Sequence, residues 1–375
     1  MKFNTQYSII FFLFLCLCLT FCRKNNQNII MLVESKKPVY TCGGETSNRY
    51  YTSILKYFLD RNGKAYIWDQ VKLDHIDVYD NSGKFLFDFG RKGQGPDEFQ
   101  ALTCVAVDRE GNIWINDGNH KSLKIFFKDG KFMKEILLPD EIKPLYMQKM
   151  VFNTEDVLYI LCSSNKGEIF IFKYDTKDFK SILIYNKKRR MKVSFVYFIP
   201  DFALDEEGNV YITDSFEYKV YKYSKEGALI KTFENKKAKK EAIDKKDFNI
   251  FDNNMKIIRY PGYREILNQL KGQSRYFPVI FGINIDQGLM YVWTSRRNGA
   301  MYIIDVYDLN FCKVGTACYF NLIRENLAQI LNGKLYIPSI ENYDPRVTDY
   351  LGKLGLSNAP EQLNVYMISK EIMSR

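Results

Sequence analysis

Histidine is scarce in this chain of 375 residues, which contains only His75 and His120. Metal sites in enzymes need several convergent His, Asp, Asn or Glu ligands, and both histidines lie in loops of variable length, where we interpret them as solvated. No CxxC pair and no GxSxG motif occurs, which argues against a zinc-cysteine site and against a serine-hydrolase nucleophile elbow. These absences favour a protein that is not an enzyme and has no cofactor or metal.

The chain also lacks an apolar run long enough to cross a membrane. The run 9–21, "IIFFLFLCLCLTF", follows Lys2 and as a helix would reach roughly 20 Å, short of a hydrocarbon core of ~30 Å. Residues 1–22 are therefore predicted to be a signal peptide. Cys22 directly follows the run and precedes "RKNNQN", which resembles a bacterial lipoprotein signal with Cys22 as the lipidated residue. An ordinary cleaved signal peptide is the alternative, because Phe21 stands where such signals carry a small residue.

Five cysteines follow Cys22 in the sequence. Because this number is odd, we expect few disulfides. Cys312 and Cys318 flank "KVGTA", which we interpret as a hairpin across which the two could form a disulfide in an oxidising compartment. We expect Cys42, Cys104 and Cys162 to be buried free thiols.

What the chain does have is an internal repeat. "FALDEEGNVYITD" (202–214) matches "VAVDREGNIWIND" (105–117), and an earlier copy starts at residue 57. Six copies start near Asp60, Asp108, Asn153, Asp205, Asp286 and Asn332. These numbers differ by 48, 45, 52, 81 and 46, and all but one difference fits a propeller blade of roughly 40–50 residues.

Each copy predicts four short strands. An apolar run ends at the Asp, a Gly-containing turn follows, and an alternating strand with one buried face comes next. The Asp side chains are expected to cap these turns by accepting bonds from nearby backbone amides. A second Gly turn and a last strand complete the unit, so we predict an all-β fold, a six-bladed β-propeller of four-stranded antiparallel blades. Seven blades are the alternative if the longest interval hides a degenerate copy.

The predicted organisation has three parts. Residues 1–22 form the signal peptide, residues 23–56 an N-terminal segment, and residues 57–375 the propeller, with an insertion at 235–278 between the fourth and fifth blades. The sixth copy lacks an outermost strand. We expect the segment near 29–40, with "IIMLV" and "PVY", to supply it and close the ring.

The repeat core D-x-x-G-N-[VI]-[YW]-[IV]-x-D resembles NHL-type repeats. The segment 90–99, "GRKGQGPDEF", is similar to a GR-x-GQGP-x-EF signature of six-bladed propeller lipoproteins found in Bacteroidetes and some other bacteria. The resemblance implies an exported propeller and says little about a ligand.

The same segment has the GxxxxG spacing of a phosphate loop. Such a loop needs Lys and Ser/Thr next, but Pro96 and Asp97 follow, and GxxGxG is not the dinucleotide fingerprint. We interpret the segment as a connection between blades. Its candidate ligand-binding residues, at the mouth of the channel, are Arg91, Gln94 and Glu98.

Basic residues exceed acidic ones, giving a formal charge of +10. A solvated lysine-rich surface explains most of it. "NKKRRMK" (186–192) adds Lys187, Arg189 and Arg190 as ligand-binding candidates, and the insertion holds eleven Lys or Arg against five Asp or Glu. A more specific interpretation than a solvated surface is that these segments bind an acidic polymer, an anionic glycan or a lipid surface.

The function we predict is non-catalytic binding or scaffolding by a monomer in the bacterial cell envelope, anchored to a membrane by lipid on its periplasmic or surface face. The partner would be a protein, peptide or glycan rather than nucleic acid. One alternative is a metal-dependent lyase or hydrolase with its site in the central channel. Another is a binder of anionic polymers or lipid surfaces through the basic insertion.

Overall fold

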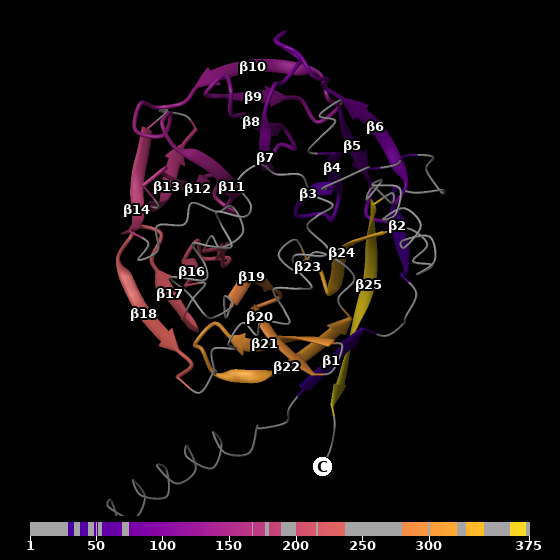
Figure 1. Cartoon of the computed structure of the whole chain (residues 1–375), viewed down its shortest axis with the longest axis vertical. Helices are drawn as coiled ribbons and strands as arrows, with labels where there is room; N and C mark the ends of the chain where they lie inside the picture. The colour runs from indigo at the N-terminus through magenta and orange to yellow at the C-terminus, as the bar shows by residue number, and fades with distance from the viewer. Residues whose placement is uncertain are drawn as a thin grey trace, which may run out of the picture.

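The computed structural model describes residues 29–33, 38–43, 49, 51, 55–69, 75–166, 168–176, 180–188, 200–214, 217–236, 280–298, 301–320, 328–340 and 361–372. Over these ranges the chain forms strands β1 to β25 and no helix. The described residues therefore contain no helix long and apolar enough to cross a membrane. The strands form six blades around a common axis (Figure 1).

Blades 1 to 4 each use four consecutive strands. Blade 1 consists of β3 (Leu55–Leu59), β4 (Ala65–Asp69), β5 (Ile76–Tyr79) and β6 (Phe85–Phe89). Blade 2 consists of β7 (Leu102–Val107), β8 (Ile113–Asp117), β9 (Ser122–Phe126) and β10 (Phe132–Leu137). Blade 3 consists of β11 (Tyr146–Phe152), β12 (Leu158–Ser163), β13 (Glu168–Asp175) and β14 (Lys180–Lys188). Blade 4 consists of β15 (Phe202–Leu204), β16 (Val210–Asp214), β17 (Lys219–Tyr223) and β18 (Leu229–Glu234).

Blades 5 and 6 share one sheet. Blade 5 consists of β19 (Ile280–Asp286), β20 (Leu289–Asn298), β21 (Met301–Asp308) and β22 (Lys313–Phe320). Blade 6 consists of β23 (Gln329–Leu331), β24 (Lys334–Ile340) and β25 (Glu361–Ile372), joined by β1 (Ile29–Val33) and β2 (Tyr40–Cys42). The predicted six-bladed propeller of four-stranded antiparallel blades is confirmed.

The two ends of the chain meet at blade 6. Both β1 and β2 pair antiparallel with β25, and β1 also pairs in parallel with β22 of blade 5. The segment 29–40, in which a closing strand is expected, contains β1 and the first residue of β2. Because β1 lies between two blades, it ties the outer edges of blades 5 and 6 together.

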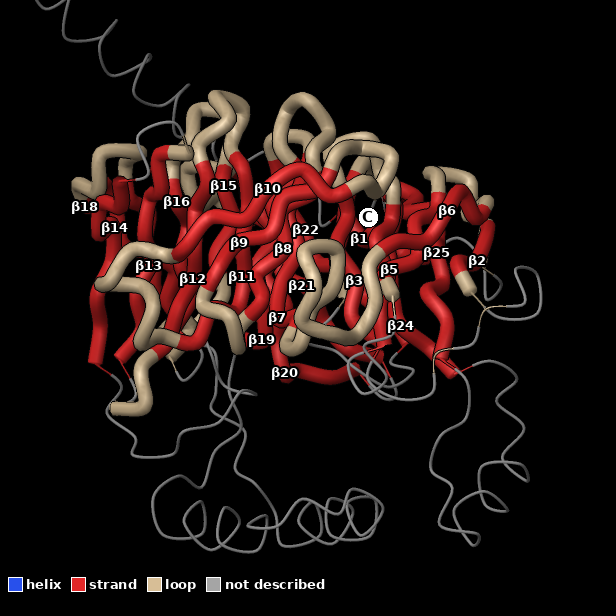
Figure 2. The backbone as a smooth tube through the Cα atoms, turned by 90° about the horizontal axis from the view of Figure 1, so that it is seen from above, coloured by secondary structure: helices blue, strands red, loops and turns tan. Residues whose placement is uncertain are grey.

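The antiparallel blades give the ring two different faces. The turns between first and second strands, and between third and fourth strands, lie at one end of each sheet; we call this end the turn face. The connections between second and third strands, and from one blade to the next, lie at the other end, which we call the loop face. Figure 2 shows the strands running between the two faces.

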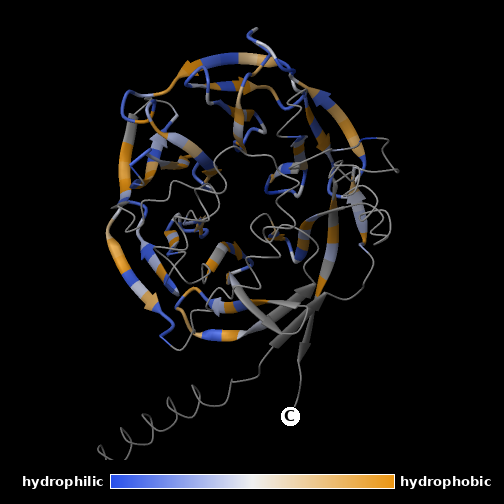
Figure 3. Cartoon of the chain, in the orientation of Figure 1, coloured by the Kyte–Doolittle hydropathy of each residue, from blue (hydrophilic) through white to orange (hydrophobic). Residues whose placement is uncertain are grey.

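The core lies between neighbouring blades. In β4 and β8 every residue is buried. The expectation of one buried face for these strands is therefore wrong, because each blade has a neighbouring blade packed against each of its two faces. The outermost strands are different: β18 carries mostly exposed residues, including Leu229 and Ile230, and polar and apolar residues follow one another along the rim (Figure 3).

The repeated aspartates cap the turns of the turn face. Asp60 Oδ1 accepts bonds from the amides two and four residues later, at 2.8 and 2.9 Å. Asp108 and Asp205 do the same with their own turns. Gly63, Gly111 and Gly208 follow with φ of 81°, 89° and 84°, where a side chain would strain the backbone. The predicted capping role is confirmed.

The predicted disulfide between Cys312 and Cys318 is wrong. "KVGTA" is no hairpin, because it lies inside the single strand β22. Six extended residue-to-residue steps place the two cysteines about 20 Å apart, whereas a disulfide needs Cα atoms within about 7 Å. Cys312 is a free, exposed thiol. Cys42, Cys104 and Cys162 are buried free thiols, as expected, and burial raises the pKa of the Cys42 and Cys104 thiols to about 12.

Candidate functional site

The loop 90–99 connects β6 of blade 1 to β7 of blade 2 on the loop face. Gly90 has a φ of 72°, and a Cβ there would overlap the fully buried ring of Phe99. The amide of Phe99 donates to the carbonyl of Arg91 at 2.9 Å, and the amide of Gly93 donates to the carbonyl of Phe99 at 3.2 Å. The loop is therefore a compact, self-bonded connection, and these bonds occupy amides that a phosphate would need.

Glu98 closes the loop from inside. Its Oε2 accepts the Gly95 amide at 2.8 Å, and its Oε1 lies 3.1 Å from Nε of Arg91. The Arg91 side chain is 66% exposed and that of Glu98 only 25%, while Gln94 is exposed. Of the three candidate residues in this loop, Glu98 holds the structure and the other two offer polar groups at the surface.

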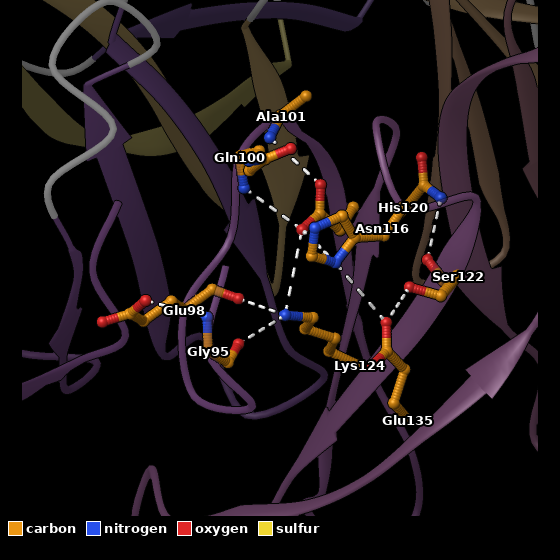
Figure 4. A network of polar contacts seen from close by, with 10 residues as sticks. Gly95, Glu98, Gln100, Ala101, Asn116, His120, Ser122, Lys124 and Glu135 are labelled. Atoms are coloured by element: carbon orange, nitrogen blue, oxygen red, sulfur yellow. Dashed lines mark hydrogen bonds and ion pairs between the residues drawn. The ribbon is translucent and has the colours of Figure 1, made fainter. Parts of the chain in front are cut away.

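Lys124 anchors the loop from blade 2. It lies on β9 and is fully buried. Its Nζ donates to the carbonyl of Gly95 at 2.9 Å and to the carbonyl of Glu98 (Figure 4). A buried ammonium is costly unless it is hydrogen-bonded and balanced by a negative charge, so its place in the fold depends on these carbonyls and on Asp117.

Asp117 supplies that charge at the end of β8. Its carboxylate is fully buried, and Oδ2 lies 3.9 Å from Nζ of Lys124. The same carboxylate accepts the amides of Gln100 and Ala101, both at 3.1 Å. Lys124 therefore holds the middle of the connection and Asp117 holds its end, which leaves the chain between blades 1 and 2 little freedom.

His120 lies against the same carboxylate. Its side chain is 25% exposed, and Nδ1 lies 3.5 Å from Oδ2 of Asp117 and 3.7 Å from Oε1 of Glu135. Glu135 in turn accepts a bond from the hydroxyl of buried Ser122. His120 is therefore only partly solvated, because two acidic side chains lie against its ring.

A second charged cluster occupies blade 1. Arg49 NH1 lies 3.4 Å from Oδ1 of Asp77, and its NH2 donates to Oδ2 of Asp88 at 2.7 Å. His75 Nε2 lies 3.3 Å from the same Asp77 oxygen, with side-chain exposures of 29% for His75 and 1% for Asp77. His75 is thus also only partly solvated and lies beside a carboxylate.

Buried tyrosines hold the other side of Asp77. Tyr51 OH donates to Oδ2 of Asp77 at 2.6 Å and lies 3.0 Å from the hydroxyl of Tyr79. Burial first, and then the Asp77 charge, raise the pKa of Tyr51 well above its usual value. The hydroxyl therefore stays protonated and donates to the carboxylate.

Blade 5 carries the same arrangement. Tyr218 OH donates to Oδ2 of buried Asp305 at 2.5 Å and lies 3.0 Å from the hydroxyl of Tyr307. Here Lys313 Nζ, 2.7 Å from Oδ1, balances the carboxylate. The signal was present in the sequence: "IDVY" occurs at 76–79 and again at 304–307, on the third strand of each blade.

Several other predicted residues lie partly or wholly outside the described part of the chain. Lys187 lies on β14, where only its backbone is described. Arg189, Arg190 and Cys22 lie outside the described residues, as do the signal peptide and nearly all of the insertion 235–278. In the described part of the chain, no three His, Cys, Asp or Glu side chains are arranged to hold a metal ion.

Comparisons with known proteins agree with this architecture. The model of the DUF5128 family, described as a 6-bladed beta-propeller, matches residues 44–262, whereas none of the curated proteins matches the chain. A crystal structure of a DUF4221 family member from Bacteroides vulgatus is similar, with a TM-score of 0.57 and 11% identity over 92% of this chain and 99% of that one. A Bacteroides fragilis protein named as exported has a TM-score of 0.50 and 16% identity, over 92% and 96%.

At these identities the solved structures support the fold alone. The family model covers more than half of the residues and includes the loop 90–99 together with both charged clusters. The chain belongs to the DUF5128 family of six-bladed β-propellers.

Proposed function

We propose that this chain is an exported, lipid-anchored propeller that acts as a non-catalytic binding or scaffold protein, with its ligand on the loop face at the channel mouth. One observation carries the proposal: the loop 90–99 is held from beneath by buried Lys124, while Arg91 and Gln94 remain exposed. A loop fixed before binding loses little conformational freedom when a partner arrives. Binding residues in proteins commonly lie on loops that a rigid scaffold positions.

The partner class that fits is a protein, peptide or glycan. Arg91 offers guanidinium donors, and Gln94 offers both a donor and an acceptor. Export and the anchor rest on the sequence of residues 1–22, and the similar Bacteroides fragilis protein is also named as exported.

A quantitative capture experiment tests the proposal. Tagged wild-type protein and an Arg91→Ala/Gln94→Ala variant are incubated with cell-envelope extract, and captured molecules are compared by mass spectrometry. We expect a partner that wild type enriches and the variant loses at least ten-fold. The matched control is Arg109→Ala/Asn81→Ala, which removes the same kind of side chains from exposed sites on the turn face. Equal capture by both variants would place the site elsewhere.

The anchor needs a separate test. Cells are labelled with a fatty-acid analogue, and the label is expected in wild type and not in Cys22→Ala. Label in neither protein would leave an ordinary secreted propeller.

The two alternative functions remain predictions. A stoichiometric metal in purified protein would support the channel enzyme. Loss of binding to anionic vesicles on deletion of residues 236–246 would support the lipid-surface binder.

A further inference from the structure

The last strand of blade 6 shows at which face the ends of the chain lie. β24 starts with Lys334, directly after the turn that joins it to β23, so this end of β24 belongs to the turn face. β25 runs antiparallel to β24, and its Met367 lies opposite Lys334. Glu361 therefore marks the loop-face end of β25, and the strand continues past Met367 to Ile372 on the turn-face side.

The N-terminal segment runs along β25 from the turn face toward the loop face. Ile29, the first residue of β1, pairs with Ile372, whereas Cys42, the last residue of β2, pairs with Leu363. On its other side β1 is parallel to β22, the fourth strand of blade 5, and Ile29 pairs with Gly315 near the turn-face start of that strand (Figure 1). Both neighbouring strands therefore place the start of β1 at the turn face.

The chain between the predicted lipid attachment site and β1 is short. Cys22 precedes Ile29 by seven residues. A chain of that length reaches at most about 25 Å when it is fully extended. β25 has twelve residues, so its two ends are about 35 Å apart. A lipid on Cys22 therefore stays within reach of the turn-face end of this strand and cannot reach the loop-face end at Glu361.

We propose that the lipid anchor holds the propeller with its turn face toward the membrane and its loop face away from it. This orientation rests on the proposed lipidation of Cys22, and it adds a direction to the proposed binding site. The loop 90–99, with its exposed Arg91 and Gln94, then faces the surrounding compartment. Its partner is a molecule of that compartment and not a lipid of the anchoring membrane.

The exposed side chains of the turn face suit a position beside lipid headgroups. Asn62, Arg109 and Glu206 lie in turns between first and second strands, and all three are exposed. Asn81 and Glu226, in turns between third and fourth strands, are exposed as well. Polar and charged groups of this kind lose their hydration at a high cost in hydrocarbon, so this face lies against the headgroups and stays outside the hydrocarbon core.

Energy transfer from a dye on the protein to dyes on the membrane measures this orientation. The lipidated protein is purified from cell membranes and added to phosphatidylcholine vesicles whose headgroups carry the acceptor dye. Cys312 is a natural position for the donor dye, because it is free, exposed and lies in the turn between β21 and β22. Cys312→Ser without any added thiol gives the background from other cysteines.

Two introduced thiols form a matched pair in the Cys312→Ser protein. Asn81→Cys and Gln94→Cys change exposed polar residues beyond opposite ends of β6. We expect transfer from Cys312 and from Asn81→Cys to be at least about two-fold higher than from Gln94→Cys, because β6 and its flanking turns keep the paired positions roughly 20 Å apart. Equal transfer from the pair, or higher transfer from Gln94→Cys, overturns the orientation.

The anchor and the orientation can fail separately. Cys22→Ala should not bind the vesicles. A wild-type protein that carries no lipid refutes the anchor, and the orientation with it. Vesicle binding that depends on Cys22, together with equal or stronger transfer from Gln94→Cys, refutes the orientation alone.

Discussion

The turn face and the loop face are built from the same repeat but stabilised in different ways. On the turn face several turns are closed by their own Asp, Asn or Ser, within five residues of sequence, whereas Asp286 of blade 5 caps the turn of blade 6. On the loop face the bonds join distant residues, such as Lys124 to the carbonyl of Gly95 and Arg49 to Asp88. Local caps repeat easily from blade to blade, whereas the distant contacts differ in each blade and give the loop face its individual surface.

The faces also differ in how blades are tied to each other. On the turn face Asn332 of blade 6 donates to the carbonyl of Arg61 in blade 1, and Thr154 of blade 3 donates to the carbonyl of Glu206 in blade 4. These two bonds are exposed and join neutral groups, and an exposed ion pair between Lys225 and Glu155 also ties blades 3 and 4. Around the loop 90–99 the loop face uses buried charges, so single substitutions there should have the larger effects.

Lys124→Met should show the largest effect of any change we propose. It leaves Asp117 buried without its cation and two carbonyls without a donor. Removing one partner of a buried charge pair costs about 3–5 kcal/mol, and we expect the free energy of unfolding in urea to fall by that amount. Lys131→Met on the turn face, where the side chain is 81% exposed, is the control. A loss below about 1 kcal/mol would mean that the buried charge adds little stability.

Asp205→Ala should have an intermediate effect on the turn face. The Asp205 carboxylate accepts two turn amides and the side chains of Asn209 and Tyr211. Loss of a cap costs about 1–2 kcal/mol, measurable as a shift in the urea midpoint. Asp80→Ala, whose cap is exposed, should cost less. Equal losses would show that burial does not matter for these caps.

This contrast explains which parts of the molecule could be predicted from sequence. Asp60, Gly63 and their repeats act within a few residues, so their spacing reveals both the turns and the blade length. The anchoring of loop 90–99 could not be predicted, because nothing in the sequence distinguishes Lys124 from an ordinary polar residue of a strand with alternating polar and apolar positions. The same holds for Arg49, whose partner Asp88 lies 39 residues away.

The errors have different physical origins. Cys312 and Cys318 suggested a hairpin because glycine lies between them, yet the neighbouring strands β21 and β1 keep that segment extended. The interpretation of the histidines as solvated rests on their place in loops, yet Asp77 follows His75 by two residues and Asp117 precedes His120 by three. Only the cysteine error comes from contacts between strands that outweigh the local signal.

Tyr51→Phe should change how the stability of the protein depends on pH. Burial raises the pKa of Tyr51 in the folded protein above the value of 10.0 for a free side chain. Stability from such a group is complete below pH 10 and is lost as pH rises from there through the folded pKa, because only the unfolded chain can then ionise. We expect the variant to lose about 1 kcal/mol at pH 7, the size of one hydrogen bond.

Urea unfolding between pH 8 and pH 11 checks this expectation. The variant should lose stability more slowly than wild type above pH 10. Tyr146→Phe, which changes an exposed tyrosine, should follow the wild-type curve. A parallel decline in wild type and Tyr51→Phe would assign the alkaline loss to other groups.

Arg91→Ala should change stability least, although Arg91 belongs to the same loop that Lys124 holds. Its side chain is 66% exposed and its ion pair with Glu98 lies at the surface, where such pairs contribute about 0–1 kcal/mol. Thermal unfolding should therefore shift by less than about 2 °C. A residue that costs so little to remove is available for a partner, whereas Glu98→Ala should destabilise more because it also frees the Gly95 amide. If Arg91→Ala proved as damaging as Glu98→Ala, Arg91 would be part of the scaffold and the binding surface would have to lie elsewhere on the loop face.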